Sequence, residues 1–560
     1  MKKIKFVLFL VMGGLLIASC NKQIEDKQTN PNQPASVPPR LLLGTILLDI
    51  SGTGSQGALS GTGSSEGVNS WDGAHRWNQY HCSNYDYYDN QIYSWTNGNF
   101  DPYLVLKNVV QMETEAAKTF PKVNPYEAVG RFVRAYYYYN LTSLFGDVPL
   151  DGDLQGVKNM TPTYTTQEKV FQYVLAELDS ANTELAGLIS GFDINNSLNS
   201  AQDLFFGQLG GADELAAWQA TVNTFRLRVL VALSNKASDA ALNVQGQFAA
   251  ILADANKYPL IPAPLPGQPV RDLQFIYNPG GANTYSTYPF NPSNFGSVAA
   301  RFNMAKAYIS TMTSLNDPRV FITSEPAWGL VGNDTLAPCK YQYFAGASTG
   351  EPLATMYNNA NAGLYSFINR KRYYSNFTGD PNVLVGYREM CFNIAEGIAR
   401  GWAPGGMAAA ETWYQNGIIA DMAFFGIDVT KNNFTATFLP PSGSSTTDVQ
   451  NYPFTFNWAT YYAQPSVKLS ATVNTAVSQI VTQKYIASFQ NNGYEPYYNW
   501  RRVGVPTFDG GSGVGNNGVV PKRWAYPVNE QAQNSKNYQA ALTAQGFSGD
   551  DLNQVMWILK

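Results

Sequence analysis

Apolar side chains recur at intervals of three and four residues in several long stretches of the chain. An α-helix turns once every 3.6 residues, so this spacing gathers the apolar side chains on one helical face. The pattern therefore predicts amphipathic helices. Their apolar faces carry Phe171, Val174, Leu175, Leu178 and Leu185; Trp218, Val222, Phe225, Val229 and Leu233; Tyr414, Ile418, Met422 and Phe425; and Val473, Val477, Ile480 and Val481.

The predicted helices come in consecutive pairs with short gaps between them. Paired amphipathic helices of this length are typical of tetratricopeptide-like stacks, in which each pair packs on the next. We therefore expect a mainly α fold built on a tetratricopeptide-like helical-pair scaffold. The predicted pairs are 101–118 with 125–145, 167–188 with 213–236, and 386–402 with 407–426, and a further helix is expected at 41–50.

Long stretches rich in Pro, Gly, Asn and Tyr separate these pairs. They cover residues 257–385, 427–465 and 501–530. Such long irregular insertions exceed what a connection between two helices requires. Since binding residues are commonly carried on loops that a rigid scaffold positions, we expect these insertions to lie on one face of the scaffold and to form the binding surface.

The N-terminus has the pattern of a secretory signal. Three lysines precede an apolar run that is too short to span a bilayer comfortably, and the run ends in Ile17-Ala18-Ser19-Cys20. Small residues directly before a cysteine resemble a bacterial lipobox, so we expect Cys20 to carry lipid chains such as palmitate; the alternative is a cleaved signal with an incidental cysteine. We predict a signal at 1–20, a flexible polar tether at 21–40 and one domain over 41–560.

The composition favours an uncharged polar ligand. Charged residues make up 14% of the chain, whereas about 25% is usual, and the chain contains 35 tyrosines. The net charge is −4 and lysines and arginines do not cluster, which argues against nucleic acid as a partner. The four cysteines are widely spaced, and lipidation of Cys20 would leave an odd number, which argues against a disulfide framework.

Several short strings resemble the SusD-like (SusD/RagB) family of outer-membrane lipoproteins. The first two are RAYYYYNL at 134–141 and LFGDVP at 144–149. Others follow in the family's order along most of the chain. They are FRLR at 225–228, NDPR at 316–319, AEGIARGW at 395–402, TQKYIA at 482–487, NWRR at 499–502 and PKRWAYP at 521–527.

This resemblance implies a cell-surface lipoprotein that is anchored in the outer membrane and captures an oligosaccharide. It also implies a partner, a SusC-like TonB-dependent barrel, for which the protein acts as a lid and to which it delivers the ligand. Neither catalysis nor a cofactor is expected. A protein of the same architecture that binds peptide or another nutrient is the alternative, and a lipid-anchored glycoside hydrolase is a third reading.

The aromatic stretch 71–100 is the first place to look for a saccharide site. Sugars offer apolar ring faces and hydroxyl edges, so a binder needs flat rings flanked by amides. The candidates are Trp71, Trp77, Asn78, Tyr80 and Trp95, with Tyr285, Tyr288 and Trp328 as weaker candidates in the mid-chain insertion. The competing interpretation is that most of these rings fill space between helices.

Two other aromatic strings favour structural roles. Four adjacent tyrosines, Tyr136–Tyr139, would point in all directions around a helix and should pack against several neighbours. The string 499–502 could form a cation–π binding cluster or maintain the fold. Asp147, Gly146 and Pro149 should end the preceding helix, and Thr165-Thr166-Gln167-Glu168 has the pattern of a capping box.

Catalytic and metal motifs are missing from the sequence. The chain has only two histidines, His75 and His81, and neither a zinc-protease helix nor a nucleophile elbow occurs. Spacing alone cannot pair carboxylates for glycoside hydrolysis. A calcium-like loop begins at Asp151 and Asp153, but its twelfth position is Pro162. We expect no metal site from a motif, and structural calcium stays open.

Overall fold

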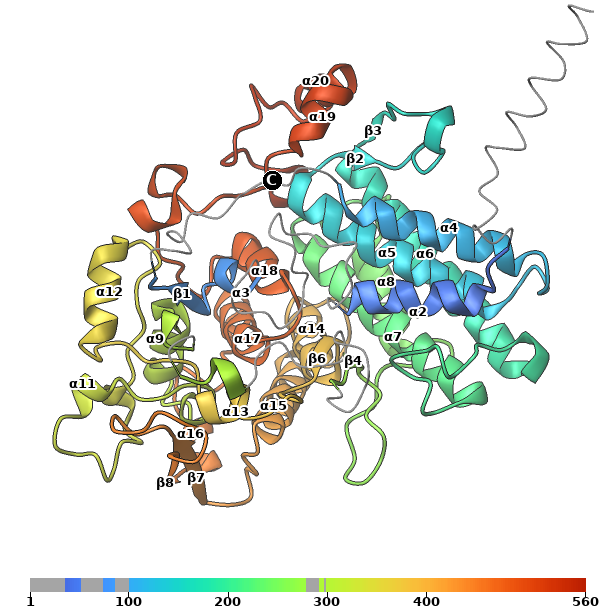
Figure 1. Cartoon of the computed structure of the whole chain (residues 1–560). Helices are drawn as coiled ribbons and strands as arrows, with labels where there is room; N and C mark the ends of the chain where they lie inside the picture. The colour runs from blue at the N-terminus through green and yellow to red at the C-terminus, as the bar shows by residue number, and fades with distance from the viewer. Residues whose placement is uncertain (1–35, 52–73, 86–99, 278–291, 297–298) are drawn as a thin grey trace, which may run out of the picture.

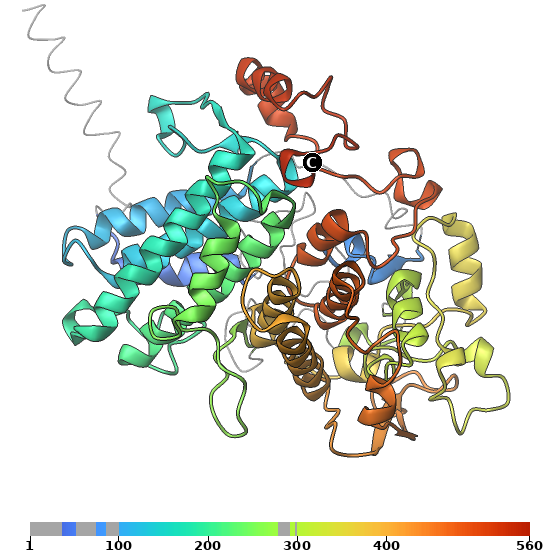
Figure 2. The same cartoon turned by 180° about the vertical axis from the view of Figure 1, so that it is seen from behind.

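Helices dominate the computed structural model, which describes residues 36–51, 74–85, 100–277, 292–296 and 299–560. Most of the long helices lie side by side on one side of the molecule, further helices lie in its middle, and short helices joined by irregular segments form the other side (Figures 1 and 2). We call the first two groups together the helical array. It consists of α2 (Pro39–Ile50), α4 (Pro102–Ala116), α5 (Pro125–Phe145), α6 (Gln167–Ser190), α7 (Gly211–Ala232), α8 (Val244–Ala253), α14 (Tyr387–Ala399), α15 (Gly406–Phe424), α17 (Val473–Ala487) and α18 (Glu495–Val503).

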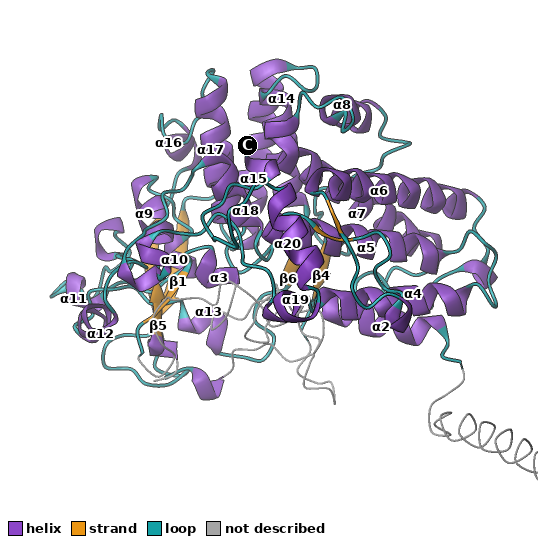
Figure 3. Ribbon diagram, turned by 90° about the horizontal axis from the view of Figure 1, so that it is seen from above, coloured by secondary structure: helices purple, strands orange, loops and turns teal. Residues whose placement is uncertain are grey.

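The predicted helical pairs are confirmed. Helix α4 packs on α5, α5 on α6, and α6 on α7; α7 then contacts α14, which packs on both α15 and α17. The view from above shows α4, α5, α6 and α7 as neighbouring rods (Figure 3). The mainly α, tetratricopeptide-like architecture is therefore the observed one, and the helix expected at 41–50 is α2.

The other side, which we call the insertion lobe, comprises the described residues of 292–381, 427–469 and 504–527. Its strands are short and form only two-stranded antiparallel pairs in the described part of the chain. Its helices are α9 (Lys306–Ser314), α10 (Val320–Thr323), α11 (Trp328–Val331), α12 (Leu353–Asn361), α13 (Arg370–Tyr374) and α16 (Trp458–Tyr462).

The remaining short elements tie the two halves together or cover them. Strand β1 (His81–Ser83), which follows α3 (Ala74–Trp77), pairs with β5 (Phe302–Met304). The other strand pairs are β2 (Val148–Pro149) with β3 (Tyr164–Thr165), β4 (Leu273–Phe275) with β6 (Asn382–Val385), and β7 (Asn433–Phe438) with β8 (Gln450–Thr455). The last helices are α19 (Val528–Gln533) and α20 (Ser535–Ala544).

The four adjacent tyrosines of α5 have the structural role predicted for them. Each of Tyr136–Tyr139 is 3% exposed or less. Their phenols reach different neighbours: the hydroxyl of Tyr138 donates to Asp153, and that of Tyr139 donates to Glu495 on α18 at 2.7 Å. Helix α5 is therefore enclosed on several sides, as its sequence requires.

The turn between α5 and α6 differs in one detail from what its sequence predicts. Gly146 ends α5 with a positive φ of 91°, as expected. The capping box, however, is wrong: it needs Thr165 as the N-cap, whereas α6 begins at Gln167 with Thr166 as its N-cap, and the Thr166 side chain makes no capping hydrogen bond. Asp147 takes its place, accepting a hydrogen bond from the Gln167 backbone N–H at 2.8 Å. Burial raises the pKa of Asp147 to about 6, although the bond from Gln167 lowers it.

Within the described residues, no helix combines the length and the apolar character that spanning a bilayer would need. Cys82, Cys339 and Cys391 are free thiols, as the sequence predicts, and burial raises the pKa of each. The predicted signal, lipid anchor Cys20 and most of the tether lie outside the described residues.

Candidate ligand-binding site

Three of the predicted ligand residues lie in the core instead of at the surface. Trp77 is 3% exposed and packs edge-on against Trp524, with ring centroids 3.9 Å apart. Asn78 is fully buried; its side chain donates to the Gly493 carbonyl at 2.8 Å and accepts from the Tyr497 backbone N–H at 3.0 Å. Because both side chains are buried, neither presents a surface that a sugar could contact.

Tyr80 also lies in the core. It is fully buried, stacks on Tyr485 at 4.7 Å and donates its hydroxyl to the Tyr485 carbonyl at 2.5 Å. The competing interpretation, in which these rings fill space between helices, therefore fits Trp77 and Tyr80. Trp71, Trp95, Tyr285 and Tyr288 lie outside the described residues.

Trp328 lies in the insertion lobe at the start of α11. It is half-buried, its indole N–H donates to the Leu439 carbonyl at 3.0 Å, and its ring lies 6.1 Å from that of Tyr452. It does not line the large cavity described next.

A cavity of about 700 Å³ opens on the insertion lobe beside α12. Three segments that are far apart in the sequence build it: Tyr85 shortly after β1, the N-terminal half of α12 with Pro352 before it, and the 3-10 turn at Ser512–Val514. Leu353 and Tyr357 share one face of α12 because they are four residues apart. The described lining residues are Tyr85, Pro352, Leu353, Ala354, Tyr357, Ser512 and Gly513.

Hydrogen bonds to backbone carbonyls and one close glycine contact hold these walls together. The Thr349 hydroxyl donates to the Asp509 carbonyl at 3.0 Å, and the Gly513 N–H donates to the Gly350 carbonyl at 3.2 Å. Gly350 and Gly510 approach so closely that a Cβ on Gly350 would lie 1.8 Å from the Gly510 carbonyl oxygen. Only glycine permits this approach.

The early aromatic segment also contacts the loop that forms one wall of the cavity. The Gln79 side chain accepts from the Asp509 N–H at 2.8 Å and donates to the Asp509 carbonyl at 2.9 Å. Gln79 therefore secures the loop that carries Ser512, whereas Trp77, Asn78 and Tyr80 do not line the cavity.

The lining has the chemistry of a site for an uncharged polar molecule. Tyr357 is 48% exposed and Tyr85 is half-buried, and the guanidinium of Arg301 lies 4.4 Å from the Tyr85 ring centroid. The rings offer flat apolar faces, while their hydroxyls, Ser512 and nearby peptide groups offer hydrogen bonds. None of the described lining residues is an acid, a histidine, a lysine or an arginine.

Two carboxyl groups lie near the cavity but not in its lining. Glu351 precedes Pro352 and accepts a hydrogen bond from the Tyr365 hydroxyl at 2.9 Å. Burial raises the pKa of Glu351, and the charge of Asp509 raises it further. Asp509 is in turn 3.8 Å from the Lys306 ammonium.

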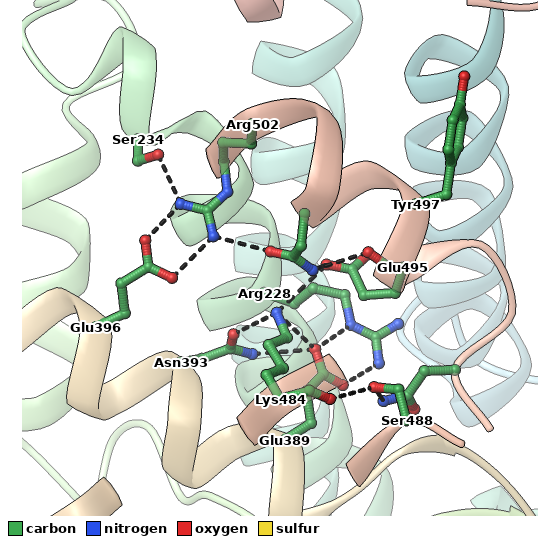
Figure 4. Close-up of polar contacts among 12 residues, drawn as sticks. Arg228, Ser234, Glu389, Asn393, Glu396, Lys484, Ser488, Glu495, Tyr497 and Arg502 are labelled. Carbon is green, nitrogen blue, oxygen red and sulfur yellow. Dashed lines mark hydrogen bonds and ion pairs between the residues drawn. The ribbon is translucent and has the colours of Figure 1, made fainter. Parts of the chain in front are cut away.

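A second polar region lies among the helices and contains residues from the short strings that resemble the SusD-like family. We call it the buried ion cluster; Figure 4 shows it between α7, α14, α17 and α18. Arg228 pairs with Glu389 at 2.8 Å, Lys484 with Glu495 at 3.4 Å, and Arg502 with Glu396 at 2.8 Å. None of these six side chains is more than 4% exposed.

The buried ion cluster is structural. Burial would raise the pKa of Glu396, but Arg502 and Arg400 outweigh burial and hold it at about 2. Arg501, next in the string 499–502, donates to the Ser143 carbonyl of α5 at 2.6 Å. Of the two interpretations of that string, fold maintenance is therefore the one these contacts support.

The sequence predicted the regions of the cavity but not its residues. Tyr85 falls within the aromatic stretch 71–100, and the rest of the lining falls within the two insertions 257–385 and 501–530. Nothing in the local sequence distinguishes Tyr357 from other exposed tyrosines. Only the folded chain brings Leu353 and Ser512 together. In the part of the chain that the structure describes, no group of three or more His, Cys, Asp or Glu side chains is placed to hold a metal ion.

Comparisons with known proteins agree on one family. The model of the SusD-like family, described as starch-binding and associating with the outer membrane, matches residues 57–527. Among curated proteins, none matches the chain.

Solved structures share the whole fold. A SusD homologue from Bacteroides fragilis is 26% identical, covers 94% of this chain and 100% of its own, and superposes with a TM-score of 0.73. A Bacteroides vulgatus outer-membrane protein with a suggested role in nutrient binding has the same identity and coverage and a TM-score of 0.71. A chitin-binding SusD homologue from Flavobacterium johnsoniae is 20% identical, covers 93% of this chain and 98% of its own, and has a TM-score of 0.65.

Proposed function

The chain belongs to the SusD-like family, and from that premise we propose that it binds a neutral oligosaccharide in the cavity beside α12 without cleaving it. The observation that carries the proposal is the lining itself: two accessible tyrosine rings with hydroxyl and peptide groups, and no ionisable acid or base besides the tyrosines among its described residues. A volume of about 700 Å³ lies in the range of small-molecule sites.

The comparisons support a saccharide over other neutral molecules. The family model is described as starch-binding, and one structural neighbour is a chitin-binding protein. Both polymers consist of sugars without acidic groups, which is the chemistry that the lining residues Tyr85 and Tyr357 suit.

We further propose that the protein is lipid-anchored through Cys20 on the outer face of the outer membrane. There it would act as a lid on a SusC-like TonB-dependent barrel and deliver the saccharide to it. The string Ile17-Ala18-Ser19-Cys20 supports the anchor, and the family's association with the outer membrane supports the location. More than one acyl chain is needed for a stable anchor.

The binding test compares two aromatic substitutions in the full chain, purified in detergent. Calorimetric titration with chitohexaose and maltohexaose should show binding of at least one. Tyr357→Ala should weaken it about tenfold or more, because a stacking ring is lost. Phe192→Ala removes another exposed ring, 37% exposed at the end of α6, and should leave the affinity unchanged.

Product analysis of the same mixtures separates the alternatives. Intact oligosaccharide after prolonged incubation agrees with capture. Cleavage that is lost on substituting one carboxylate would favour the glycoside hydrolase, and binding of peptides in place of both saccharides would favour the peptide alternative.

The anchor has its own test, which does not depend on the ligand. Cys20→Ala should move the protein from the membrane fraction to the soluble fraction of cells that lack the partner barrel. Persistence in the membrane of such cells would contradict lipidation at Cys20.

A further inference from the structure

A second cavity, of about 520 Å³, lies elsewhere on the insertion lobe, between α13, the end of α15 and strand β7. We call it the basic cavity. None of its lining residues is shared with the cavity beside α12. Its walls combine apolar groups with hydrogen-bonding side chains, among them Lys371, Arg372, Asn376, Asp380, Phe425, Phe434 and Thr435.

Charge distinguishes the basic cavity from the first one. Its described lining contains Lys371, Arg372 and Asp380 as the only charged residues, so the net charge is positive. Arg372 and Asp380 neutralise each other, with Nε of Arg372 2.7 Å from the carboxylate. Lys371 is exposed, and no described residue forms an ion pair with its ammonium. One cation is therefore left for a ligand.

The uncommitted polar groups around Lys371 are also donors. The Asn376 side-chain oxygen already accepts the N–H groups of Thr378 at 2.9 Å and Gly379 at 2.7 Å, which leaves its NH₂ group to donate. Thr435 is exposed, and its hydroxyl has no partner among the described residues. The Thr435 hydroxyl can donate or accept, but the Lys371 ammonium and the Asn376 NH₂ group can only donate, so the ligand must supply acceptor oxygens.

The apolar part of the lining favours a ring over a small inorganic anion. Phe425 and Phe434 both border the cavity. The guanidinium of Arg372 lies 4.9 Å from the Phe425 ring centroid, and Phe434 stacks on Phe454 at 5.6 Å, so both rings are fixed in place. Phe425 is only 2% exposed and serves as packing, so the half-buried Phe434 is the ring that a ligand can contact. A fixed ring beside hydroxyl and amide donors suits a sugar.

We propose that the basic cavity is a second saccharide site, which takes sugars that carry a carboxylate. Lys371 pairs with the carboxylate, while the Asn376 amide and the Thr435 hydroxyl donate to the sugar's oxygens. This site is independent of the neutral-glycan site and goes beyond the proposed function, because saccharide binding in the basic cavity does not require saccharide binding in the cavity beside α12.

The test uses digalacturonate as the acidic probe and its dimethyl ester as the neutral one, titrated into the full chain in detergent. Digalacturonate should bind, and the ester should bind about tenfold more weakly, because hydrogen bonds to a charged group are the strong ones. Inorganic phosphate should bind more weakly than digalacturonate. Equal binding of phosphate would overturn the assignment to a saccharide.

Substitutions locate the site. Lys371→Gln should weaken digalacturonate binding about tenfold, and Thr435→Val, which keeps the side-chain shape, should weaken it less. Lys107→Gln makes the same charge change on the exposed face of α4 and should have no effect. Tyr357→Ala, in the other cavity, should have none either. Failure of digalacturonate to bind, or unchanged binding by Lys371→Gln, would overturn the proposal.

Discussion

The buried ion cluster and the cavity beside α12 are both assembled from segments far apart in the chain, but by opposite means. In the ion cluster, charged side chains from four elements pair with one another out of reach of water, as Arg502 and Glu396 do. At the cavity, the walls meet through backbone groups and close glycine contacts, such as Gly350 against Gly510, which leave side chains like Tyr357 exposed. The first arrangement holds the fold together, and the second presents a surface.

The largest effect should come from breaking the ion cluster. Glu396→Gln leaves Arg502 buried without its partner charge, and loss of one member of a buried pair costs about 3–5 kcal/mol of the free energy of unfolding. Denaturant titration followed by circular dichroism measures this loss. Asp213→Asn, whose side chain is 71% exposed on α7, is the control and should change stability by less than about 0.5 kcal/mol.

A loss of less than about 1 kcal/mol in Glu396→Gln would contradict the structural role of the cluster. The pH dependence of the free energy of unfolding provides a second test. The pKa of Glu396 in the folded protein, about 2, lies below its ordinary value of 4.5. Its contribution to stability is therefore present above 4.5 and lost as pH falls toward 2.

A smaller effect should come from the glycine contact at the cavity. Gly350→Ala places a Cβ 1.8 Å from the Gly510 oxygen, so the backbone must shift, at a cost of about 1–3 kcal/mol, and saccharide binding should weaken as Ser512 moves. The matched change in the array, Gly187→Ala, meets no atom within 4 Å and should stabilise α6 by about 0.5–1 kcal/mol.

The two alanine variants are compared by denaturant titration and by calorimetry with the same saccharide. If Gly350→Ala kept wild-type stability and affinity, the contact would not shape the cavity. If Gly187→Ala destabilised the protein, the packing described around α6 would be wrong.

A pH-dependent effect is expected at a carboxyl pair in the array. Glu214 accepts from the Ser200 hydroxyl at 2.6 Å; burial, with a further contribution from Asp203, raises its pKa from 4.5 to about 7. The folded state thus holds the proton more tightly than the unfolded state. Its stabilising effect is complete below pH 4.5 and is lost as pH rises through 7.

In the wild type the free energy of unfolding should fall as pH rises and Glu214 ionises. Glu214→Gln should abolish this fall, because an amide does not titrate. Denaturant titrations near pH 4.5 and above pH 7 measure it, and Asp213→Asn, one residue earlier on α7, should retain it. A variant with the same pH slope as the wild type would show that another group titrates.

The contrast between the buried ion cluster and the cavity also explains which features could be predicted from the sequence. Helix pairs follow from apolar periodicity, and Tyr136–Tyr139 could be assigned to packing because adjacent helical residues point in all directions. Trp77 and Tyr80 fit the composition of ligand platforms but are buried, because composition does not report burial. The cap of α6 was missed because Asp147 reaches it across a turn, and Tyr357 and Ser512 meet only through long-range folding.

A crystal structure of the full chain with a bound neutral oligosaccharide would show where the saccharide binds. We expect a sugar ring in the cavity beside α12, against Tyr357 or Tyr85, with its hydroxyls bonded to Ser512 or neighbouring peptide groups and its glycosidic bonds intact. A saccharide bound on the helical array with this cavity empty, or a cleaved product beside Glu351 and Asp509, would contradict the proposed function.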